Sequence, residues 1–508
     1  MRTKNSIKNI SISIFSQIIM IILGFLTRKI FLDNLGAEYL GVNGLLTSVI
    51  SMLGLAESGI GISIIYNLYK PLAENDEEKV IALVQLYKKL YGILAIIILG
   101  LSLALYPFID KLITDGESIK YLGVVYFIFV IKNIISYLNA HKWSLINADQ
   151  KAYVIAKYNL IFQVVTTLAK IGVLLYTKNY ILYLLIETLI FIVQNLYNGK
   201  VVEKHYPYIK TKKKYSVDNH VKSNIITNVK ALFLHSIGSY CVFGTDNILI
   251  SAFINVKTVG LYSNYSLITT QVNTLVAPII SGLESSIGNL IATESEEKSY
   301  EIFKVTYLIN FWVYSLSVII LWNIIEPFIC WWIGPQYLID KLTLIVILIN
   351  LYINGLRSSI GTFKTKAGLF TQDKYMPLIE AIINLGVSII LVRYLGLAGI
   401  FIGTTISTLS IVFWNVPRIA YKYVFKRSVW EYFILYGGYV VLTLVTGWAT
   451  TSLCNSLISG YSFISLIFRG IICVIIPNIV YILIFWKNKE FRYLLGIALG
   501  LINNIIKK

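Results

Sequence analysis

With 56% hydrophobic and only 14% charged residues over 508 positions, the chain is more apolar than an ordinary soluble protein. Its formal charge of +18 would suit nucleic-acid binding, but the basic residues fall in alternate loops between long apolar runs, which is the positive-inside pattern of membrane proteins. We therefore expect a polytopic membrane protein with no nucleic-acid partner. The four cysteines have no CxxC or metal-like spacing, so no metal site is expected.

Apolar runs long enough to cross a bilayer recur along the chain. The first follows Arg2, Lys4 and Lys8 without an A-x-A-like cleavage site, so we expect a retained membrane helix rather than a signal peptide. The pattern predicts an all-α polytopic membrane protein with about 14 transmembrane helices. The predicted spans are 8–32, 40–66, 86–109, 119–140, 153–176, 180–199, 225–253, 259–292, 303–328, 337–362, 377–394, 397–417, 430–454 and 461–486.

The loop charges predict how the chain is oriented. An even number of spans places both termini on one side, and most Lys and Arg residues lie in the loops on that side. Because cytoplasmic loops carry the excess of Lys and Arg, both termini are expected to be cytoplasmic. Six basic residues fall on the opposite side: Lys111, Lys120, Lys178, Lys257, Lys341 and Arg393.

The longest inner connection carries the basic run Lys210-Thr211-Lys212-Lys213-Lys214. We interpret it as a linker that fixes the topology and touches anionic lipid, at about 1 kcal/mol per basic residue, with specific substrate docking as the alternative. Two pseudo-symmetric six-helix lobes are expected around it, followed by two extra helices and a tail that suits the inner interface. The predicted domains are 1–199 (first lobe), 200–224 (linker), 225–420 (second lobe), 421–486 (two additional helices) and 487–508 (cytoplasmic amphipathic tail).

An internal repeat supports the two lobes. Thr27-Arg28-Lys29-Ile30-Phe31-Leu32 leads to Gly41, as Thr245-Asp246-Asn247-Ile248-Leu249-Ile250 leads to Gly260. The pentapeptides Glu57-Ser58-Gly59-Ile60-Gly61 and Glu284-Ser285-Ser286-Ile287-Gly288 follow in the same order, and each precedes an acidic stretch. Internal repeats with Gly-interrupted apolar segments are common in membrane transporters and point to their substrate site.

Charges inside the predicted spans mark candidate functional positions, because each costs about 2.5–3.5 kcal/mol to insert. We select four cationic residues as candidates for substrate binding in a central cavity, with a purely structural role as the alternative: Arg28, Lys132, Lys170 and Arg357. We also note eight further ionisable residues within spans: Lys29, Glu57, Glu187, Lys230, His235, Asp246, Glu284 and Arg469.

Four of these residues are candidates for gating or ion coupling. Glu57 and Glu284 are repeat equivalents beside glycines, and either contact a ligand or ion or bond neighbouring helix ends. Asp246 is expected to pair with Arg28, since the repeat places both at matching depth. His235 either carries a proton, as imidazole can near neutral pH, or packs as a hydrogen-bonded side chain.

Residues 12–66, 243–268 and 278–298, together with the basic linker, resemble the polysaccharide repeat-unit flippases. These form the O-antigen and capsule transporter family of the multidrug/oligosaccharidyl-lipid/polysaccharide exporter superfamily. The last of these stretches reads PIISGLESSIGNLIATESEEK. The likeness covers the whole chain in span count and layout. The related peptidoglycan-precursor flippases carry an Arg-Asp pair at the end of the first span, where this chain has Arg28-Lys29.

The resemblance implies a two-lobed transporter of the bacterial cell membrane. Such proteins carry undecaprenyl-diphosphate-linked oligosaccharide from the cytoplasmic to the outer leaflet by alternating access, for capsule, exopolysaccharide or O-antigen assembly. They work beside a polysaccharide polymerase and glycosyltransferases, and in contact with membrane lipids. No cofactor is expected beyond H+ or Na+ as a coupling ion.

Two other classes compete with this interpretation. A cation-coupled exporter of small molecules or drugs would use the same fold, but would need an acidic cavity that binds cations. A membrane enzyme would need a sizeable outer loop or a cluster of His, Asp and Glu near one membrane face, and the sequence offers neither. We therefore expect no enzymatic activity.

Overall fold

The structure is a computed structural model that describes residues 2–113, 119 and 121–496. Within this range it leaves out the side chains of 2–16, 18, 220, 228, 230–232, 234, 235, 239, 243, 277–286 and 292. In the described part, all regular secondary structure is helical and there is no strand. It divides into two compact units, residues 1–263 and 264–508, which we describe separately.

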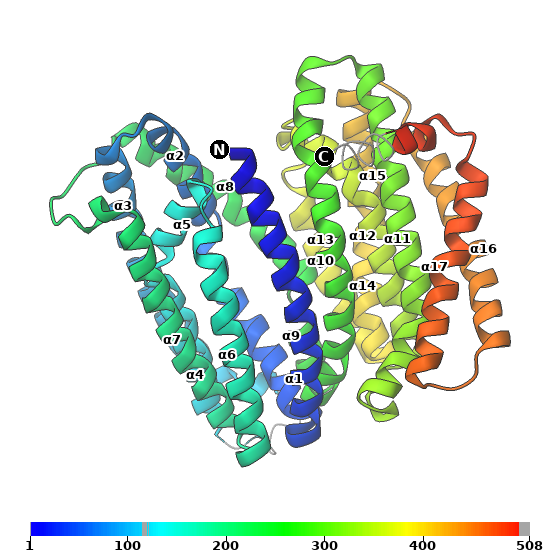
Figure 1. Ribbon diagram of the computed structural model, residues 1–508, viewed down its shortest axis with the longest axis horizontal. Coiled ribbons are helices and arrows are strands. Elements are labelled where there is room, and N and C mark those ends of the chain that lie inside the picture. Colours follow the sequence, from blue (N-terminus) through cyan, green and yellow to red (C-terminus); the bar gives the residue numbers. More distant parts are fainter. Residues whose placement is uncertain (1, 114–118, 120, 497–508) are drawn as a thin grey trace. The chain divides into compact units, whose positions relative to one another are not determined.

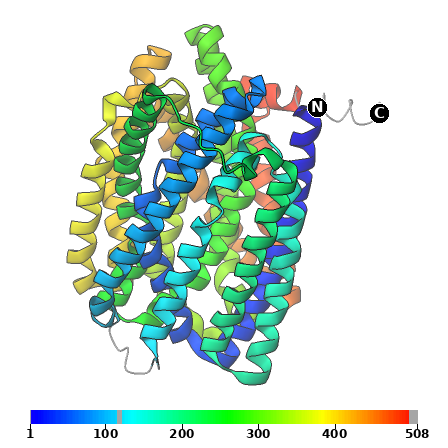
Figure 2. The same cartoon turned by 90° about the vertical axis from the view of Figure 1, so that its left-hand side faces the viewer.

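The first unit is built from nine helices and the start of a tenth (Figure 1). Figures 1 and 2 show α6 and α7 side by side along their length, as expected for two helices joined by a two-residue turn. The helices are α1 (Arg2–Leu53), α2 (Ile60–Glu74), α3 (Glu77–Leu105), α4 (Leu122–Tyr137), α5 (Ala140–Ala148), α6 (Tyr153–Thr177), α7 (Tyr180–His205), α8 (Asn219–Phe243), α9 (Asp246–Phe253) and α10 (Val256–Thr293).

The second unit contains the rest of α10 and seven further helices around an aromatic core. Phe311 of this core stacks on Tyr439 with ring centroids 4.2 Å apart, and Phe303 stacks on Tyr307 at 5.4 Å. The helices are α11 (Glu296–Trp332), α12 (Lys341–Lys366), α13 (Met376–Leu395), α14 (Leu397–Ser410), α15 (Val412–Ala420), α16 (Trp430–Leu457) and α17 (Phe463–Phe485). The predicted domain boundaries remain predictions, and most of the predicted tail lies outside the described residues.

Each predicted span is helical over most of its length, but the count of fourteen is not confirmed. Among the described residues ten helices are long and apolar enough to cross a membrane, or eleven if α4 and α5, bent by 46°, form one span. Part of the difference arises because most of 8–32 and 40–66 falls on the single candidate Ile19–Glu57, and part because predicted spans are divided. The range 40–66 crosses from α1 through a 3-10 turn into α2, and 225–253 is divided between α8 and α9.

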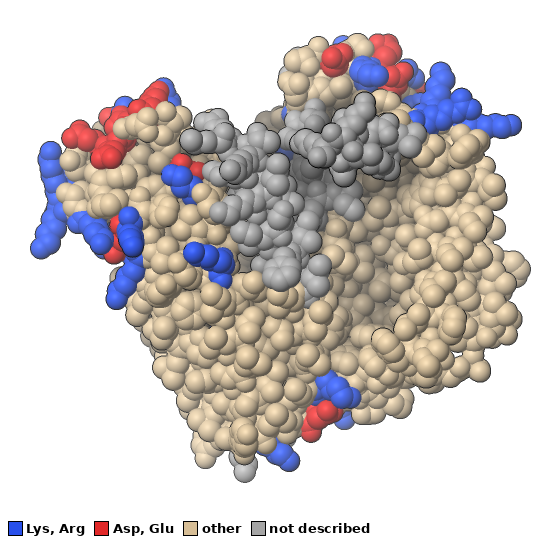
Figure 3. All heavy atoms as spheres, in the orientation of Figure 1, with Lys and Arg blue, Asp and Glu red and all other residues tan. Residues whose placement is uncertain are grey.

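The surface of the helices is that of a multi-pass membrane protein. Large apolar side chains in the middle of helices face outward, including Ile96 (72% exposed), Leu444 (67%) and Trp448 (74%). On the face seen in Figure 3, Lys, Arg, Asp and Glu gather mostly at the helix ends, and the middle of the helices is largely free of them. An apolar band of this kind is satisfied by lipid, and helices spanning it satisfy their own backbone hydrogen bonds.

The acidic stretches of the repeat begin two long helices. Asp76 caps α3 by accepting a hydrogen bond from the Lys79 backbone N–H at 3.0 Å, and Ser295 caps α11 through the Lys298 N–H at 3.2 Å. Acidic residues in the first turn of both helices interact favourably with the positive, N-terminal end of the helix dipole. Hydrogen bonding from the Lys79 side chain lowers the pKa of the Asp76 carboxyl. The repeated acidic stretch is thus a repeated helix start.

Gly36 interrupts α1 between the first two predicted spans. Its φ of 84° and ψ of 179° lie in a region that essentially only glycine adopts. We expect Gly36→Ala to lower the free energy of unfolding by about 1–3 kcal/mol, measured by thermal unfolding in detergent. Gly24→Ala, in the same helix with open space around the added Cβ, is the matched control. Equal stability of the two variants would contradict this prediction.

Candidate functional site

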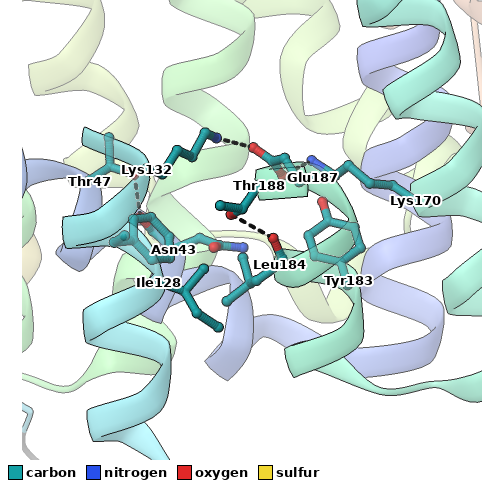
Figure 4. Close-up of a pocket in the computed structure, with 10 residues that line it drawn as sticks. Asn43, Thr47, Ile128, Lys132, Lys170, Tyr183, Leu184, Glu187 and Thr188 are labelled. Atoms are coloured by element: carbon teal, nitrogen blue, oxygen red, sulfur yellow. Dashed lines mark hydrogen bonds and ion pairs between the residues drawn. The ribbon is translucent and has the colours of Figure 1, made fainter. Parts of the chain in front are cut away.

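A cavity of about 220 Å³ lies among α1, α4, α6 and α7 of the first unit and holds a group of charged side chains inside the apolar part of the helices (Figure 4). We call it the charged cavity. Its polar wall is fixed by hydrogen bonds, since the Tyr180 hydroxyl donates to Asn43 Oδ1 at 2.9 Å and the Thr188 hydroxyl to the Leu184 carbonyl at 2.8 Å. Its lining is Asn43, Thr47, Ile128, Phe129, Lys132, Lys170, Tyr183, Leu184, Glu187 and Thr188.

Two of the predicted cations meet at one carboxylate. Lys132 of α4 and Lys170 of α6 both donate to Glu187 of α7, each to a different oxygen, and approach it from opposite sides in Figure 4. The side chains are 35%, 18% and 22% exposed, respectively. A carboxylate that accepts from two ammonium groups offsets much of their insertion cost. With all three groups ionised, the cluster carries a net charge of +1.

The spacing of residues on α7 explains this arrangement. Tyr183, Glu187 and Phe191 follow one another at intervals of four residues and so lie on one face of the helix. The Lys170 ammonium lies 4.4 Å from the centre of the Tyr183 ring, and that of Lys132 lies 5.8 Å from the Phe191 ring. Each lysine therefore combines an ion pair with a cation–π contact to an aromatic ring one turn away.

Arg28 has a different environment. Its guanidinium donates to Ser263 Oγ at 2.9 Å and lies near Tyr183, which lines the charged cavity. Among the described residues it forms no ion pair, so the expected pair with Asp246 is absent. Ser263 in turn donates to the Gly260 carbonyl at 2.9 Å. The guanidinium thus keeps donors available for an anion.

Arg357, the fourth predicted cation, belongs to the second unit. It lies on α12 and donates to Asn354 Oδ1 at 2.9 Å. Glu380 is close enough to interact electrostatically and accepts a hydrogen bond from the Thr408 hydroxyl at 3.1 Å. Glu380 is 6% exposed and lies in the predicted span 377–394, and it is not among the charged residues selected from the sequence.

The gating candidates are only partly described. Glu57 ends a 3-10 turn, lies close enough to the Tyr91 and Tyr137 hydroxyls to interact with them, and lines a second cavity. Asp246 lies in the first turn of α9. The side chains of His235 and Glu284 lie outside the described residues, so their roles remain predictions. The described part contains no group of three His, Cys, Asp or Glu residues able to hold a metal ion.

The sequence did not assign Glu187 a role, although it is the acidic residue at the centre of the charged cavity. Its partners lie 55 and 17 residues away in the chain, so no local pattern joins them. The available signal was on α7 itself, where one acid falls between two aromatic residues at helical spacing. When one span carries an acid and other spans carry lysines, an ion pair between them is the first role to assign to the acid.

Comparison with known proteins places the fold. No protein-family model matches the chain, and no curated protein matches it by sequence. Among solved structures, the lipid II flippase MurJ in an inward closed conformation has a TM-score of 0.68 at 14% identity, over 94% of this chain and 99% of that one. A multidrug resistance MATE transporter of the MOP superfamily, inward-facing, has a TM-score of 0.56 at 15% identity, over 79% and 94%.

A third similar structure is the Vibrio cholerae MATE transporter VcmN, with a TM-score of 0.56 at 11% identity, over 85% of this chain and 99% of that one. Likeness at this level of identity concerns the fold. The chain therefore has the fold of MOP superfamily transporters, a fold that serves both a lipid flippase and drug exporters.

Proposed function

We propose that this protein is a flippase that moves an undecaprenyl-diphosphate-linked oligosaccharide from the cytoplasmic to the outer leaflet of a bacterial cell membrane. It works by alternating access, without catalysis, and supplies capsule, exopolysaccharide or O-antigen assembly. One observation carries the proposal: Lys132 and Lys170 line a cavity inside the membrane region and share one carboxylate, and nearby Arg28 forms no ion pair with any described residue. A transporter fold with an excess of cations suits an anionic substrate.

The chemistry of the charged cavity fits a diphosphate. The headgroup can compete with Glu187 for the two ammonium groups, while Arg28 supplies the planar donors that suit phosphate oxygens. An outward move through an inside-negative potential of about 100 mV favours each negative charge by about 2.3 kcal/mol. The protein's task is then to lower the desolvation barrier, and the membrane potential, with or without H+ or Na+ coupling, biases the direction.

An apolar cavity in the second unit suits the lipid part of such a substrate. Its volume is about 740 Å³, and it lies between α11, α12, α14 and α16. Ile319, Ile349, Leu444 and Trp448 are among the apolar side chains of its wall. Transfer of hydrocarbon into such surroundings needs no polar partner, and a long chain can also stay in the bilayer.

The second candidate function is a cation-coupled exporter of small molecules. Glu187 favours it, because a carboxylate at the centre of a cavity can exchange its lysine partners for a cationic ligand or a proton. The two lysines at that carboxylate argue for the flippase, since they repel a cation. A polysaccharide polymerase and glycosyltransferases are proposed as partners only for the flippase function, and not for the exporter function.

Movement of a fluorescent undecaprenyl-diphosphate oligosaccharide between leaflets of liposomes tests the proposal. We expect Arg28→Ala to slow this movement by about tenfold, the cost of one charge-assisted hydrogen bond, and Arg28→Lys to keep part of the rate. Lys70→Ala, which removes a cation that is 83% exposed at the surface, is the control and is expected to match the wild type. Dithionite quenching of the outer leaflet gives the rates.

Two results would overturn the proposal. If folded wild-type protein moves no diphosphate lipid under any ion gradient, the flippase function fails. If an imposed proton gradient instead drives these liposomes to accumulate an organic cation, the exporter function replaces the flippase function. Equal rates for Arg28→Ala and the wild type would remove Arg28 from the site without affecting the function.

A further inference from the structure

A second cavity of the first unit is lined by amides rather than charges. Its volume is about 380 Å³, and we call it the amide cavity. Four amide side chains line it, Asn159 from α6 and Gln194, Asn195 and Asn198 from α7. Among the side chains that the structure describes, no Lys or Arg lines it, whereas two lysines line the charged cavity. The two cavities therefore suit different chemical groups.

The amides form a hydrogen-bond network that is left incomplete. Gln194 Nε2 and Asn198 Nδ2 both donate to Asn159 Oδ1, at 3.0 and 2.6 Å, and Asn139 Nδ2 donates to Asn195 Oδ1 at 2.6 Å. Asn198 is 3% exposed, yet its Oδ1 has no hydrogen-bond partner among the described residues. A buried acceptor without a donor is unfavourable, so a ligand hydroxyl or amide N–H that reaches it is favoured.

The other walls of the amide cavity complete a site for a sugar. Trp143 and Tyr137 present aromatic surface, on which the C–H face of a sugar ring can stack, and Glu57 adds a carboxylate. Amide groups both donate and accept, as sugar hydroxyls and acetamido groups do. Because no described lining side chain is a cation, the cavity offers a phosphate no ion pair that would offset the loss of its hydration.

The amide cavity and the charged cavity lie along the same helix faces. Asn198 follows Glu187 by eleven residues on α7, and Asn159 precedes Lys170 by eleven on α6, which runs antiparallel to it. At 1.5 Å per residue both steps are about 16 Å, so the two cavities are displaced along one groove of the α6–α7 pair. Phe191 lies between them, since it lines the amide cavity and carries Lys132 over its ring.

We propose that the amide cavity is the subsite for the neutral sugars of the substrate, while Lys132 and Lys170 hold its diphosphate. This assignment rests on the proposed flippase function and adds to it a place for the glycan. Hexose or N-acetylhexosamine units a short distance along the oligosaccharide from the diphosphate occupy the amide cavity. Their hydroxyl or acetamido groups form hydrogen bonds with the amide side chains that line the cavity, and one ring stacks on Trp143.

Two lipids that differ only in their sugars test the proposal. Purified full-length protein in nanodiscs of phosphatidylethanolamine and phosphatidylglycerol is titrated with undecaprenyl diphosphate, and with the same lipid carrying a neutral trisaccharide of N-acetylhexosamine and hexose. We expect the wild type to bind the glycosylated lipid about tenfold more tightly, the gain from one or two hydrogen bonds and a stacked ring. Asn198→Leu and Trp143→Ala should each reduce that preference to about threefold or less, and leave binding of the bare lipid unchanged.

Trp143→Ala keeps the proposal testable if Asn198→Leu fails to fold, because Trp143 takes no part in the amide network. Asn67→Leu, which removes a hydrogen bond from the Asn67 amide to the Ser63 carbonyl on α2 outside the cavity, is the matched control and should keep the full preference. Equal affinity of the wild type for the two lipids would overturn the sugar subsite and leave the flippase standing. If both variants weaken the two lipids equally, the amides are structural only. If neither lipid binds the folded wild type, the flippase function itself fails.

Discussion

Replacing Glu187 with glutamine is expected to lower the free energy of unfolding by about 2–3 kcal/mol, because it leaves Lys132 and Lys170 facing each other without a carboxylate. Removing one member of a buried ion pair costs about 3–5 kcal/mol, and the partial exposure of these side chains to the cavity reduces that figure. Thermal unfolding of the purified protein in detergent, followed by circular dichroism, measures the change.

The same helix provides a matched control. Glu203 of α7 also forms ion pairs with two lysines, Lys142 at 2.8 Å and Lys210 at 3.8 Å, but it lies near the end of the helix. At that end Lys210 is 59% exposed, although Lys142 is 13% exposed, so Glu203→Gln is expected to cost less than Glu187→Gln. Equal losses for the two variants would contradict the assignment of Glu187 to an environment poor in water.

A triple variant separates stability from substrate binding. Lys132→Met, Lys170→Met and Glu187→Leu together replace the ion pairs with apolar side chains of similar size, which in buried sites is often neutral or stabilising. Such a protein should regain the stability lost in Glu187→Gln and still fail to bind the diphosphate lipid. The comparison distinguishes a cluster that holds the fold from one that also serves the substrate.

The sequence predicted the helices well because apolar runs of this length are a strong, local signal. For example, the run 153–176 lies in α6, and the run 180–199 lies in α7. It predicted breaks less well. The repeat suggested equal structures for Glu57 to Gly61 and Glu284 to Gly288, yet the first copy leaves a 3-10 turn at Gly59, with φ of 88°, and the second is continuous helix. The second copy has Ser286 where the first has Gly59.

The contents of the site were harder to predict than the helices. Lys132 and Lys170 were identified because a charge inside an apolar run is conspicuous. Their common partner was not, because pairing depends on which faces of α4, α6 and α7 meet. The amides Asn159 and Asn198 gave no signal, because single Asn residues in an apolar run resemble helix-packing residues until their side chains are seen to line one cavity.

The pairing changes what the charges can do in a transport cycle. Fully unpaired lysines would bind an anion tightly and release it slowly, whereas a resident carboxylate competes for them at every step. For the proposed flippase, Glu187 therefore both reduces the cost of the empty cavity and weakens retention of a diphosphate headgroup. A flippase needs this balance, because its substrate must leave on the far side without an input of chemical energy.

The repeat also placed two glycines at one helix crossing. Gly41 of α1 and Gly260 of α10 are repeat equivalents, and each lies against the backbone of the other helix. A Cβ on Gly41 would collide with the Val256 carbonyl, and one on Gly260 with the carbonyl of Ala37. Small residues allow such close backbone approach in membrane helices, where the tight packing itself is the attraction.

We therefore expect Gly41→Ala to disrupt this crossing, at a cost of about 3 kcal/mol or more if the crossing is permanent, since a rigid backbone carbonyl has to move. Gly44→Ala, one turn further along α1, is the matched control. Its Cβ would meet side chains rather than backbone, Val259 at 3.0 Å and Asn247 at 3.6 Å, and side chains can turn aside at a smaller cost. Thermal unfolding and the liposome assay are run on both variants.

The two measurements together decide what the crossing does. Lost stability in Gly41→Ala means that α1 and α10 stay in contact throughout the cycle and act as a fixed support. Retained stability with lost transport means that the crossing opens and closes, because the added methyl then excludes only the conformation in which the helices touch. Two variants that both behave like the wild type would contradict the close approach itself, since no backbone can accept a methyl group at that position without moving.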